Sequence, residues 1–228
     1  MGMIDKEILR KNLDEVIWKI EQARIGVSEH HIVKLVTVAK YTDIENISTL
    51  YALGQRAFGE NQVQQLKERI DTLDALPLEW HMLGTLQKNK INNLIDLNPS
   101  LFHALDSIDL AQELNKKLEA KGQTMAALLQ INAAKEESKS GVQSEAAFDL
   151  YQQIKQTCPQ ITLKGVMTIG AHTQDQKQIQ KSFETTYAIY EKVQKEGATI
   201  CSMGMSGDYE LAIACGSNLV RVGSALFR

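Results

Sequence analysis

The sequence predicts an α/β protein, a single (β/α)8 TIM barrel with one extra helix before its first strand. Eight short apolar runs alternate with segments of helical periodicity, and such alternation favours parallel strands joined by right-handed crossovers. Eight parallel strands are the number that closes this barrel. The rival is an open doubly wound sheet, but the first run lacks the G-x-G-x-x-G turn that is typical of one.

The elements follow from this alternation in order. Residues 5–25 are the extra helix, because apolar side chains recur there at helical spacing. The expected strands are 33–39, 56–59, 80–83, 101–105, 125–131, 163–169, 199–203 and 219–222. The expected helices are 44–54, 60–73, 86–96, 107–121, 144–156, 176–196 and 206–215. With three prolines and no linker, residues 1–228 are expected to form one domain.

Composition excludes several classes of function. A net charge of −3 provides no basic field for nucleic acid. The three cysteines (Cys158, Cys201 and Cys215) are odd in number and lack C-x-x-C spacing, which favours a reducing cytosol over a disulfide scaffold or a zinc site. No apolar stretch approaches the roughly 18 residues of a membrane span. We therefore expect a cytoplasmic protein without membrane contact, and a monomer, because no apolar face is left over.

Small-residue turns end the last two apolar runs. Gly204-Met-Ser-Gly207 follows the first of them and Gly223-Ser224 follows the second. Barrels bind phosphate after their seventh and eighth strands, through backbone N–H groups and hydroxyls at such turns. The phosphate candidates are therefore Ser206, Gly223 and Ser224. Ser206 also suits the N-cap of the helix expected at 206–215.

Lys40 ends the first strand, on the face that alternation gives to Val36 and Val38. If those valines fill the barrel, Lys40 points into its mouth. A desolvated lysine near other cations has a lowered pKa and becomes nucleophilic, as an imine-forming amine must. The alternative is a lysine that has merely reached solvent.

Arg221 is in phase with Gly223 in the last strand. An inward arginine there would contact the ring or carboxylate of a phosphorylated ligand. The alternative is an arginine paired with a barrel carboxylate such as Glu60 or Asp106.

Two further polar residues lie at strand ends. Asn61 either donates to a ligand oxygen or caps the following helix, and His81 is either an acid–base group or a hydrogen-bonded core residue. The strand ends bring no cluster of His, Cys and carboxylate together, so we expect no metal site.

Six blocks of the sequence occur in an order that is characteristic of one family. They are Val36-Thr-Val-Ala-Lys40, Phe58-Gly-Glu-Asn-Gln-Val-Gln64, Trp80-His-Met-Leu-Gly-Thr-Leu-Gln-Lys-Asn-Lys90, Ile131-Asn-Ala-Ala-Lys-Glu-Glu-Ser-Lys-Ser-Gly141, Lys164-Gly-Val-Met-Thr-Ile169 and Ser202-Met-Gly-Met-Ser206 with the tail to Phe227. In these blocks the chain resembles the YggS/PROSC family of pyridoxal-phosphate-binding homeostasis proteins. Their barrel is similar to the N-terminal domain of bacterial alanine racemase.

The resemblance implies pyridoxal 5′-phosphate as cofactor and a role for each candidate residue. Lys40 falls on the Schiff-base lysine, Arg221 on the arginine facing the pyridine nitrogen, and Asn61 on a residue near the ring. Ser206, Gly223 and Ser224 fall on phosphate-binding positions. The family commonly has serine where this chain has Ala39, which faces away from Lys40 by alternation, so we expect little effect.

The resemblance also implies a carrier without catalytic residues, active in vitamin B6 homeostasis, with apo-enzymes as candidate recipients. An arginine opposite the ring nitrogen disfavours its protonation and weakens the electron sink. In the related racemases a tyrosine from a partner's C-terminal domain serves the second face, and this chain stops at Arg228. One alternative is a low-activity racemase or decarboxylase using His81 or Tyr209. Another is a barrel for a phosphosugar or flavin without an imine.

Overall fold

The structure is a computed structural model that describes residues 2–136 and 140–228. Part of the Ile131–Gly141 block therefore lies outside the described residues. The strands are β1 (Lys34–Val38), β2 (Ala57–Glu60), β3 (Glu79–Met82), β4 (Leu101–Leu105), β5 (Met125–Asn132), β6 (Val142–Gln143), β7 (Ile161–Thr168), β8 (Ile200–Ser202) and β9 (Leu219–Val222). The helices are α1 (Lys6–Val27), α2 (Ile44–Ala52), α3 (Val63–Thr72), α4 (Ile91–Leu97), α5 (Ile108–Ala120), α6 (Ala147–Thr157), α7 (Gln176–Gln194) and α8 (Tyr209–Ala214).

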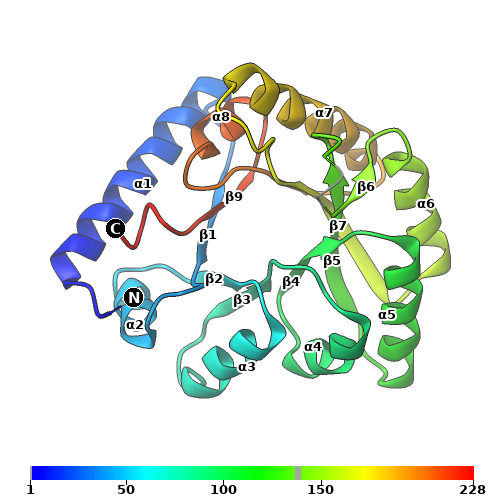
Figure 1. The fold of residues 1–228 in the computed structure, drawn as a ribbon, viewed down its shortest axis with the longest axis horizontal. Coiled ribbons are helices and arrows are strands. Elements are labelled where there is room, and N and C mark those ends of the chain that lie inside the picture. Colours follow the sequence, from blue (N-terminus) through cyan, green and yellow to red (C-terminus); the bar gives the residue numbers. More distant parts are fainter. Residues whose placement is uncertain (1, 137–139) are drawn as a thin grey trace.

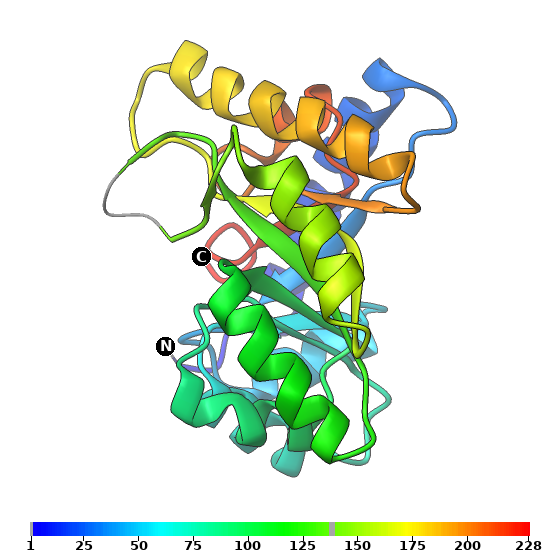
Figure 2. The same cartoon turned by 90° about the vertical axis from the view of Figure 1, so that its right-hand side faces the viewer.

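The strands pair in parallel and close on themselves. The sheet order is β4-β3-β2-β1-β9-β8-β7-β5-β6, and a further pairing of β4 with β5 completes the ring. The short β6 pairs only with the end of β5. Helices surround the ring in both views (Figures 1 and 2). The predicted TIM barrel with an extra N-terminal helix is thus confirmed, and the open doubly wound sheet is wrong.

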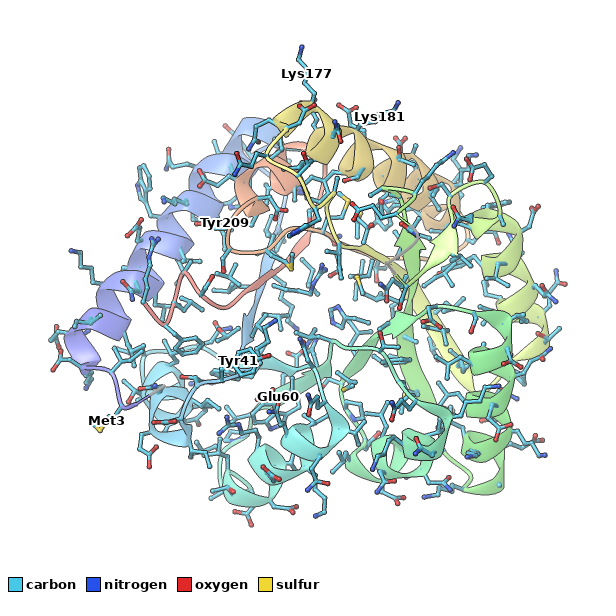
Figure 3. All side chains as sticks on the ribbon, in the orientation of Figure 1. Met3, Tyr41, Glu60, Lys177, Lys181 and Tyr209 are labelled. Atoms are coloured by element: carbon cyan, nitrogen blue, oxygen red, sulfur yellow. The ribbon has the colours of Figure 1, made fainter. Side chains whose placement is uncertain are left out.

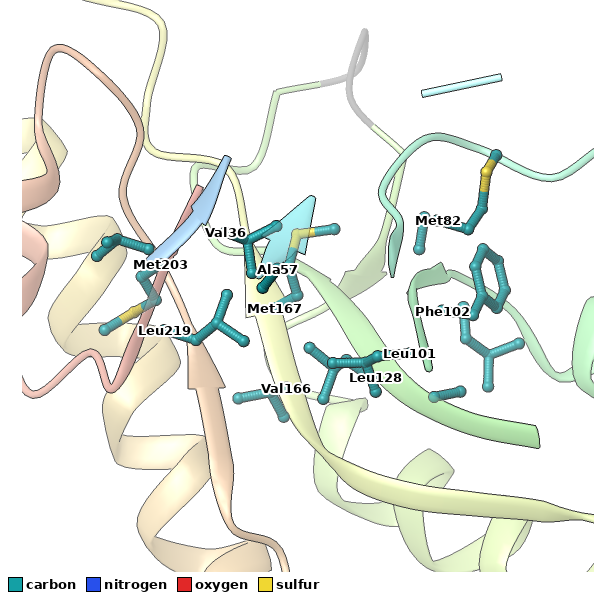
Figure 4. Packing of buried hydrophobic residues seen from close by; sticks show 14 of the residues in the cluster. Val36, Ala57, Met82, Leu101, Phe102, Leu128, Val166, Met167, Met203 and Leu219 are labelled. Carbon is teal, nitrogen blue, oxygen red and sulfur yellow. The ribbon is translucent and has the colours of Figure 1, made fainter. Parts of the chain in front are cut away.

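The barrel interior is packed with side chains from different strands. Register places Val36 opposite Arg221 and Leu219 opposite Ser202, so these side chains share the inward face. Figure 4 shows Val36, Leu101 and Leu128, from three strands, among these buried side chains. Strands buried on both faces have to be short apolar runs, which is why the sequence revealed them.

Local capping explains where several helices begin. Asp5 Oδ1 accepts a hydrogen bond of 2.8 Å from the Glu7 amide at the start of α1. Ser107 Oγ accepts one of 3.2 Å from the Leu110 amide at the start of α5. Such caps satisfy amides that have no partner within the first helical turn.

Helix α1 packs along the side of the barrel against α8 and α2 (Figure 1). Its inner face buries Leu9, Leu13, Val16 and Ile20. The buried Asn12 amide donates to the carbonyl oxygens of Leu226 (3.0 Å) and Arg228 (2.9 Å). The helix therefore fixes the segment that follows β9. No helix of the described residues is long and apolar enough to cross a membrane.

Several predicted helix boundaries differ from the structure. The helices expected at 60–73 and 144–156 begin three residues later, at Val63 and Ala147. The helix expected at 86–96 begins with a 3-10 turn, Lys88–Lys90, before α4. The helix expected at 206–215 begins only at Tyr209, because residues 206–208 form a turn.

Gly165 in β7 is a position where the barrel requires glycine. Its φ is +149°, and a Cβ there would lie 1.8 Å from the carbonyl oxygen of Ile200 in β8. We expect Gly165→Ala to lower the free energy of unfolding in urea by about 2 kcal/mol or more, because backbone atoms would have to move. Gly26→Ala is the control, since a Cβ there meets nothing within 4 Å. It should raise stability by up to ~1 kcal/mol; equal effects of the two changes would refute the backbone clash.

Candidate functional site

The sheet order places the candidate residues on four adjacent strand ends. Asn61 follows β2, Lys40 follows β1, Gly223 follows β9 and Ser206 follows β8, and these strands are neighbours in the order β2-β1-β9-β8. All four lie at the carboxyl end of the barrel, where TIM barrels carry their sites.

The turns after β8 and β9 are joined by hydrogen bonds. Ser206 Oγ accepts from the backbone amides of Gly223 (3.1 Å) and Ala225 (3.2 Å). The Gly204 carbonyl accepts from the Arg221 amide at 3.0 Å. Two amides thus donate to the Ser206 oxygen, whose own proton can be given to an oxygen atom of a phosphate.

Two glycines allow the backbone segments around these turns to approach each other so closely. Gly204 has φ +97°, and a Cβ there would lie 2.7 Å from Ala212 Cβ. At Gly223 a Cβ would lie 3.2 Å from Val38 Cβ. The turn after β9 therefore packs against the end of β1, two residues before Lys40.

Ser217 holds the strands beneath this turn. Its buried hydroxyl lies within hydrogen-bond distance of three carbonyl oxygens, Cys201 (3.1 Å), Met203 (2.8 Å) and Leu219 (2.9 Å). It also accepts from the Met203 amide at 3.2 Å. This single side chain fixes β8 relative to β9, and hence the two turns relative to each other.

The expectation that Ser206 caps a helix is wrong. The N-cap of α8 is Asp208, two residues later. Asp208 Oδ1 accepts from the Met205 amide at 2.7 Å and so shapes the turn itself. The hydroxyl of Ser206 is instead engaged by the turn after β9.

Lys40 lies in a turn one residue beyond Ala39 and is exposed. Its Nζ lies 5.7 Å from the ring centroid of Tyr41. Tyr41 is 73% exposed and has φ +68°, a left-handed conformation that is uncommon for a non-glycine residue. Figure 3 labels Tyr41 near the centre of the view. The Lys40 amine is therefore solvated, which corrects the expectation that burial would activate it.

Arg221 is a buried cation whose hydrogen bonds go to neutral oxygens. NH1 donates to Ser202 Oγ, and NH2 donates to the Thr168 carbonyl at 2.8 Å. Burial lowers the pKa of the guanidinium to about 10, opposed by the charge of Asp208. Ser202 and Thr168 were not expected from the sequence as hydrogen-bond partners of Arg221. Inward register with Leu219 is the signal that could have identified Ser202.

The alternative partners of Arg221 are engaged elsewhere. Glu60 Oε1 accepts from Arg69 Nε of α3 at 3.3 Å. Burial raises the pKa of Glu60, and Arg69 opposes the shift. Asp106 Oδ1 accepts from the Ser107 hydroxyl at 3.2 Å. Pairing of Arg221 with either carboxylate is therefore wrong.

Asn61 and Ser224 are less closely tied to the joined turns. Asn61 lines a surface pocket with Gln62, Thr85 and Lys90, at the ends of β2 and β3. The N-cap of α3 is Gln62, so the capping alternative for Asn61 is wrong. Ser224 is exposed in the turn after β9. The ligand contacts of both residues stay predictions.

The two residues considered as a second acid–base group are both buried. His81 is buried and hydrogen-bonded to His103 and Glu79, as expected of a core histidine. Tyr209 is buried at the start of α8, which packs against α1 (Figure 3). Among the described residues no group of three or more His, Cys, Asp or Glu side chains is placed to hold a metal ion.

Comparison with known proteins agrees with this geometry. The family model described as alanine racemase, N-terminal domain, matches residues 5–228. The pyridoxal phosphate homeostasis protein of Helicobacter pylori is 53% identical over 219 residues, covering 96% of this chain and 98% of that one. Its counterpart in Mus musculus is 35% identical over 207 residues, covering 85% and 76%.

Solved structures extend the comparison. PipY of Synechococcus elongatus, in a structure with PLP bound, has a TM-score of 0.82 and 29% identity, covering 96% of this chain and 100% of that one. An alanine racemase of Clostridium difficile has a TM-score of 0.76 at 18% identity, covering 97% and 56%, and shows the fold alone.

The barrel, its N-terminal helix and the joined turns define a TIM-barrel protein of the alanine racemase N-terminal type. Within that class, the chain belongs to the YggS/PROSC family, whose members are named pyridoxal phosphate homeostasis proteins.

Two arginines with different surroundings, the half-buried Arg69 and the buried Arg221, give a test of which one the fold needs. Arg69→Met leaves the buried carboxylate of Glu60 without its cation, and we expect a loss of about 3 kcal/mol of unfolding free energy at pH 7. Arg221→Met removes a buried cation bonded to neutral oxygens, so stability should change by less than ~1 kcal/mol or rise. Chemical denaturation of both variants measures the difference.

The pH dependence has a defined sign. The folded-state pKa of Glu60 is raised, so the folded protein takes up this proton first as pH falls. The deficit of Arg69→Met should therefore shrink toward acid pH. A deficit that grows on acidification, or an Arg221→Met loss as large as that of Arg69→Met, contradicts this assignment.

Proposed function

We propose that this protein binds pyridoxal 5′-phosphate as a Schiff base on Lys40 and releases it reversibly in vitamin B6 homeostasis, without robust catalysis of its own. The supporting observation is the convergence of the Ser206 hydroxyl with the Gly223 and Ala225 amides beside the end of β1. The names of the relatives, and the PLP-bound PipY structure, point to the same ligand.

The residues at the mouth fit this cofactor. A phosphate dianion suits two amides and a hydroxyl, and the Ser224 turn adds a further hydroxyl beside them. The aldehyde would meet the Lys40 amine at the end of the adjacent strand. In the covalent step Lys40 Nζ bonds to the aldehyde carbon, and the aldehyde oxygen leaves as water. Asn61 is assigned to the neighbourhood of the ring.

The exposure of Lys40 supports a reversible carrier. Water reaches the amine, so the same bond can be hydrolysed without a rearrangement of the barrel. Bound pyridoxal phosphate supplies an electron sink for carbanions. Arg221, assigned to the ring nitrogen, disfavours its protonation because two cations would face each other, and so keeps that sink weak.

The surroundings of the mouth suit a protein recipient. Tyr41, Ile169 and Met205 follow three strands at this end and are exposed apolar side chains. We assign apo-enzymes that use pyridoxal phosphate as recipients, and place the protein in the cytoplasm as a monomer. Its three cysteines are free thiols, in keeping with a reducing compartment.

The alternative is a low-activity racemase or decarboxylase, because Lys40 could serve one face of an amino acid substrate. His81 and Tyr209, considered for the other face, are both buried. Steady formation of a D-amino acid or an amine from L-amino acids, at enzyme-like rates, would favour the enzyme over the carrier.

The Schiff base predicts a visible absorbance band when the purified protein is mixed with pyridoxal phosphate. We expect borohydride to remove the band and Lys40→Ala to abolish it, because Lys40 follows β1, the strand that pairs with β9 and its turn. The matched control is Lys67→Ala on the outer surface of α3, where the lysine pairs with Asp71. A band that survives in Lys40→Ala, or binding of a phosphosugar or flavin without an imine, contradicts the proposal.

The phosphate role of Ser206 predicts a separate phenotype. Ser206→Ala removes one hydrogen bond to a charged group, worth roughly 1.5–3 kcal/mol. We expect retention of pyridoxal phosphate to fall by about tenfold or more, while the imine spectrum is kept. Gly207→Ala in the same turn is the control, since its Cβ meets nothing within 4 Å. Equal dissociation constants for the two variants would argue against this role.

A further inference from the structure

A row of hydrogen-bonded polar side chains crosses the barrel interior beneath the mouth. Glu79 Oε1 lies 2.8 Å from His81 Nε2, and His81 Nδ1 lies 2.8 Å from His103 Nε2. His103 Nδ1 lies 3.4 Å from Ser202 Oγ, which accepts from Arg221. The row joins β3, β4, β8 and β9, and the function proposed above uses only its last member.

The register of the strands explains why these side chains meet. Gly59 is opposite His81, and His81 is opposite Leu101, two residues before His103. All of them face inward, with Ser202 and Arg221. A Cβ at Gly59 would lie 2.5 Å from Leu83 Cδ1, so the glycine makes room for Leu83 in this layer. His81, His103 and Ser202 are each at most 1% exposed.

With both histidine rings neutral, one set of hydrogen-bond directions follows from the carboxylate at one end of the row and the guanidinium at the other. A guanidinium only donates, so Ser202 Oγ accepts from Arg221 and has its own proton to give. His103 Nδ1 is the acceptor for that proton, which leaves the His103 proton on Nε2. His103 Nε2 then donates to His81 Nδ1, and the His81 proton is likewise on Nε2.

Glu79 ends the row as its only anion. It is the first residue of β3, and its carboxylate accepts from both His81 and Lys34. The hydrogen bond from His81 is the largest cause that lowers the pKa of Glu79 to about 2. A carboxylate only accepts, so it sets the Nε2–H form of His81. Burial is the largest cause that holds the pKa of His103 well below its usual range, so this ring stays neutral.

We propose that Glu79 positions the guanidinium of Arg221 from the amino end of the barrel, by fixing the tautomers of the two histidines between them. Each link is a donor aimed toward Glu79, so the aligned dipoles leave a lone pair of Ser202 directed at Arg221. Glu79 thereby influences Arg221 through the row, without contact between them. It is a positioning residue that touches no ligand.

One consequence rests on the proposed function. If Arg221 faces the pyridine nitrogen of pyridoxal phosphate, its orientation governs the absorbance of the bound ring. The tautomers themselves are a property of this chain alone. They can therefore be measured without the cofactor.

Nitrogen-15 NMR of the histidine rings in the full-length protein tests the proposal. Nitrogen shifts distinguish protonated from unprotonated ring nitrogens, and coupling across the N–H···N bond identifies the His81–His103 pair. The variant is Glu79→Gln, whose side chain offers His81 either an oxygen or an amide group. The matched control is Lys34→Gln, which breaks the same ion pair but leaves the carboxylate in place.

We expect both rings as Nε2–H in the unmodified protein and in Lys34→Gln. In Glu79→Gln the Nδ1–H form should appear in both rings together, because only one N–H can occupy the hydrogen bond between them. With pyridoxal phosphate added, Glu79→Gln and Ser202→Ala should shift the absorbance maximum, whereas Lys34→Gln should not. Ser202→Ala should leave the tautomer of His81 unchanged, since that is set from Glu79.

Three results would overturn the proposal: Nδ1–H on His103 in the unmodified protein, unchanged rings in Glu79→Gln, or identical changes in Glu79→Gln and Lys34→Gln. The last would show that only the ion pair matters. If the tautomers behave as expected but neither the variants nor the unmodified protein bind pyridoxal phosphate, the role of Glu79 in the row is supported and the proposed function fails.

Discussion

The pairing of β1 with β9 is the constraint on which the candidate site depends, because it closes the barrel. Val36 lies opposite Arg221, and Gly223 packs against Val38. The first and last strands of the sequence thereby become neighbours, and Lys40 comes to the same rim as the joined turns. The packing of α1 against α8 also joins the two ends of the sequence, but the β1–β9 pairing is what brings their strand ends to one rim.

The interior of the barrel serves two purposes that pull in different directions. Apolar side chains such as Val36 and Leu128 fill it and stabilise the ring (Figure 4). Arg221 and the two histidines are polar groups in the same space, each costly to bury unless hydrogen-bonded. Their bonds to one another and to Ser202 meet that requirement. The fold thus carries a polar line through its core that packing alone does not need.

The architecture could be read from the sequence because barrel strands buried on both faces are short and apolar, and helices between them are amphipathic. The contacts of the candidate residues could not, because they are made between strands. Serine is a residue type that often caps helices, yet the hydroxyl of Ser206 accepts hydrogen bonds from the amides of residues 223 and 225. Lys40 has the phase of an inward residue, yet the turn at Tyr41, with φ +68°, leaves it solvated. Arg221 donates to the neutral hydroxyl of Ser202 on β8, and not to Glu60 or Asp106, the carboxylates considered from the sequence.

The proposed function depends on one covalent bond, the Schiff base on Lys40 at the rim of β1. Hydride reduction of the protein loaded with pyridoxal phosphate, followed by peptide mass spectrometry, locates that bond to a residue. We expect one pyridoxyl group per chain, on the peptide that contains Lys40. A modification spread over surface lysines, or a single adduct at another lysine, would contradict it.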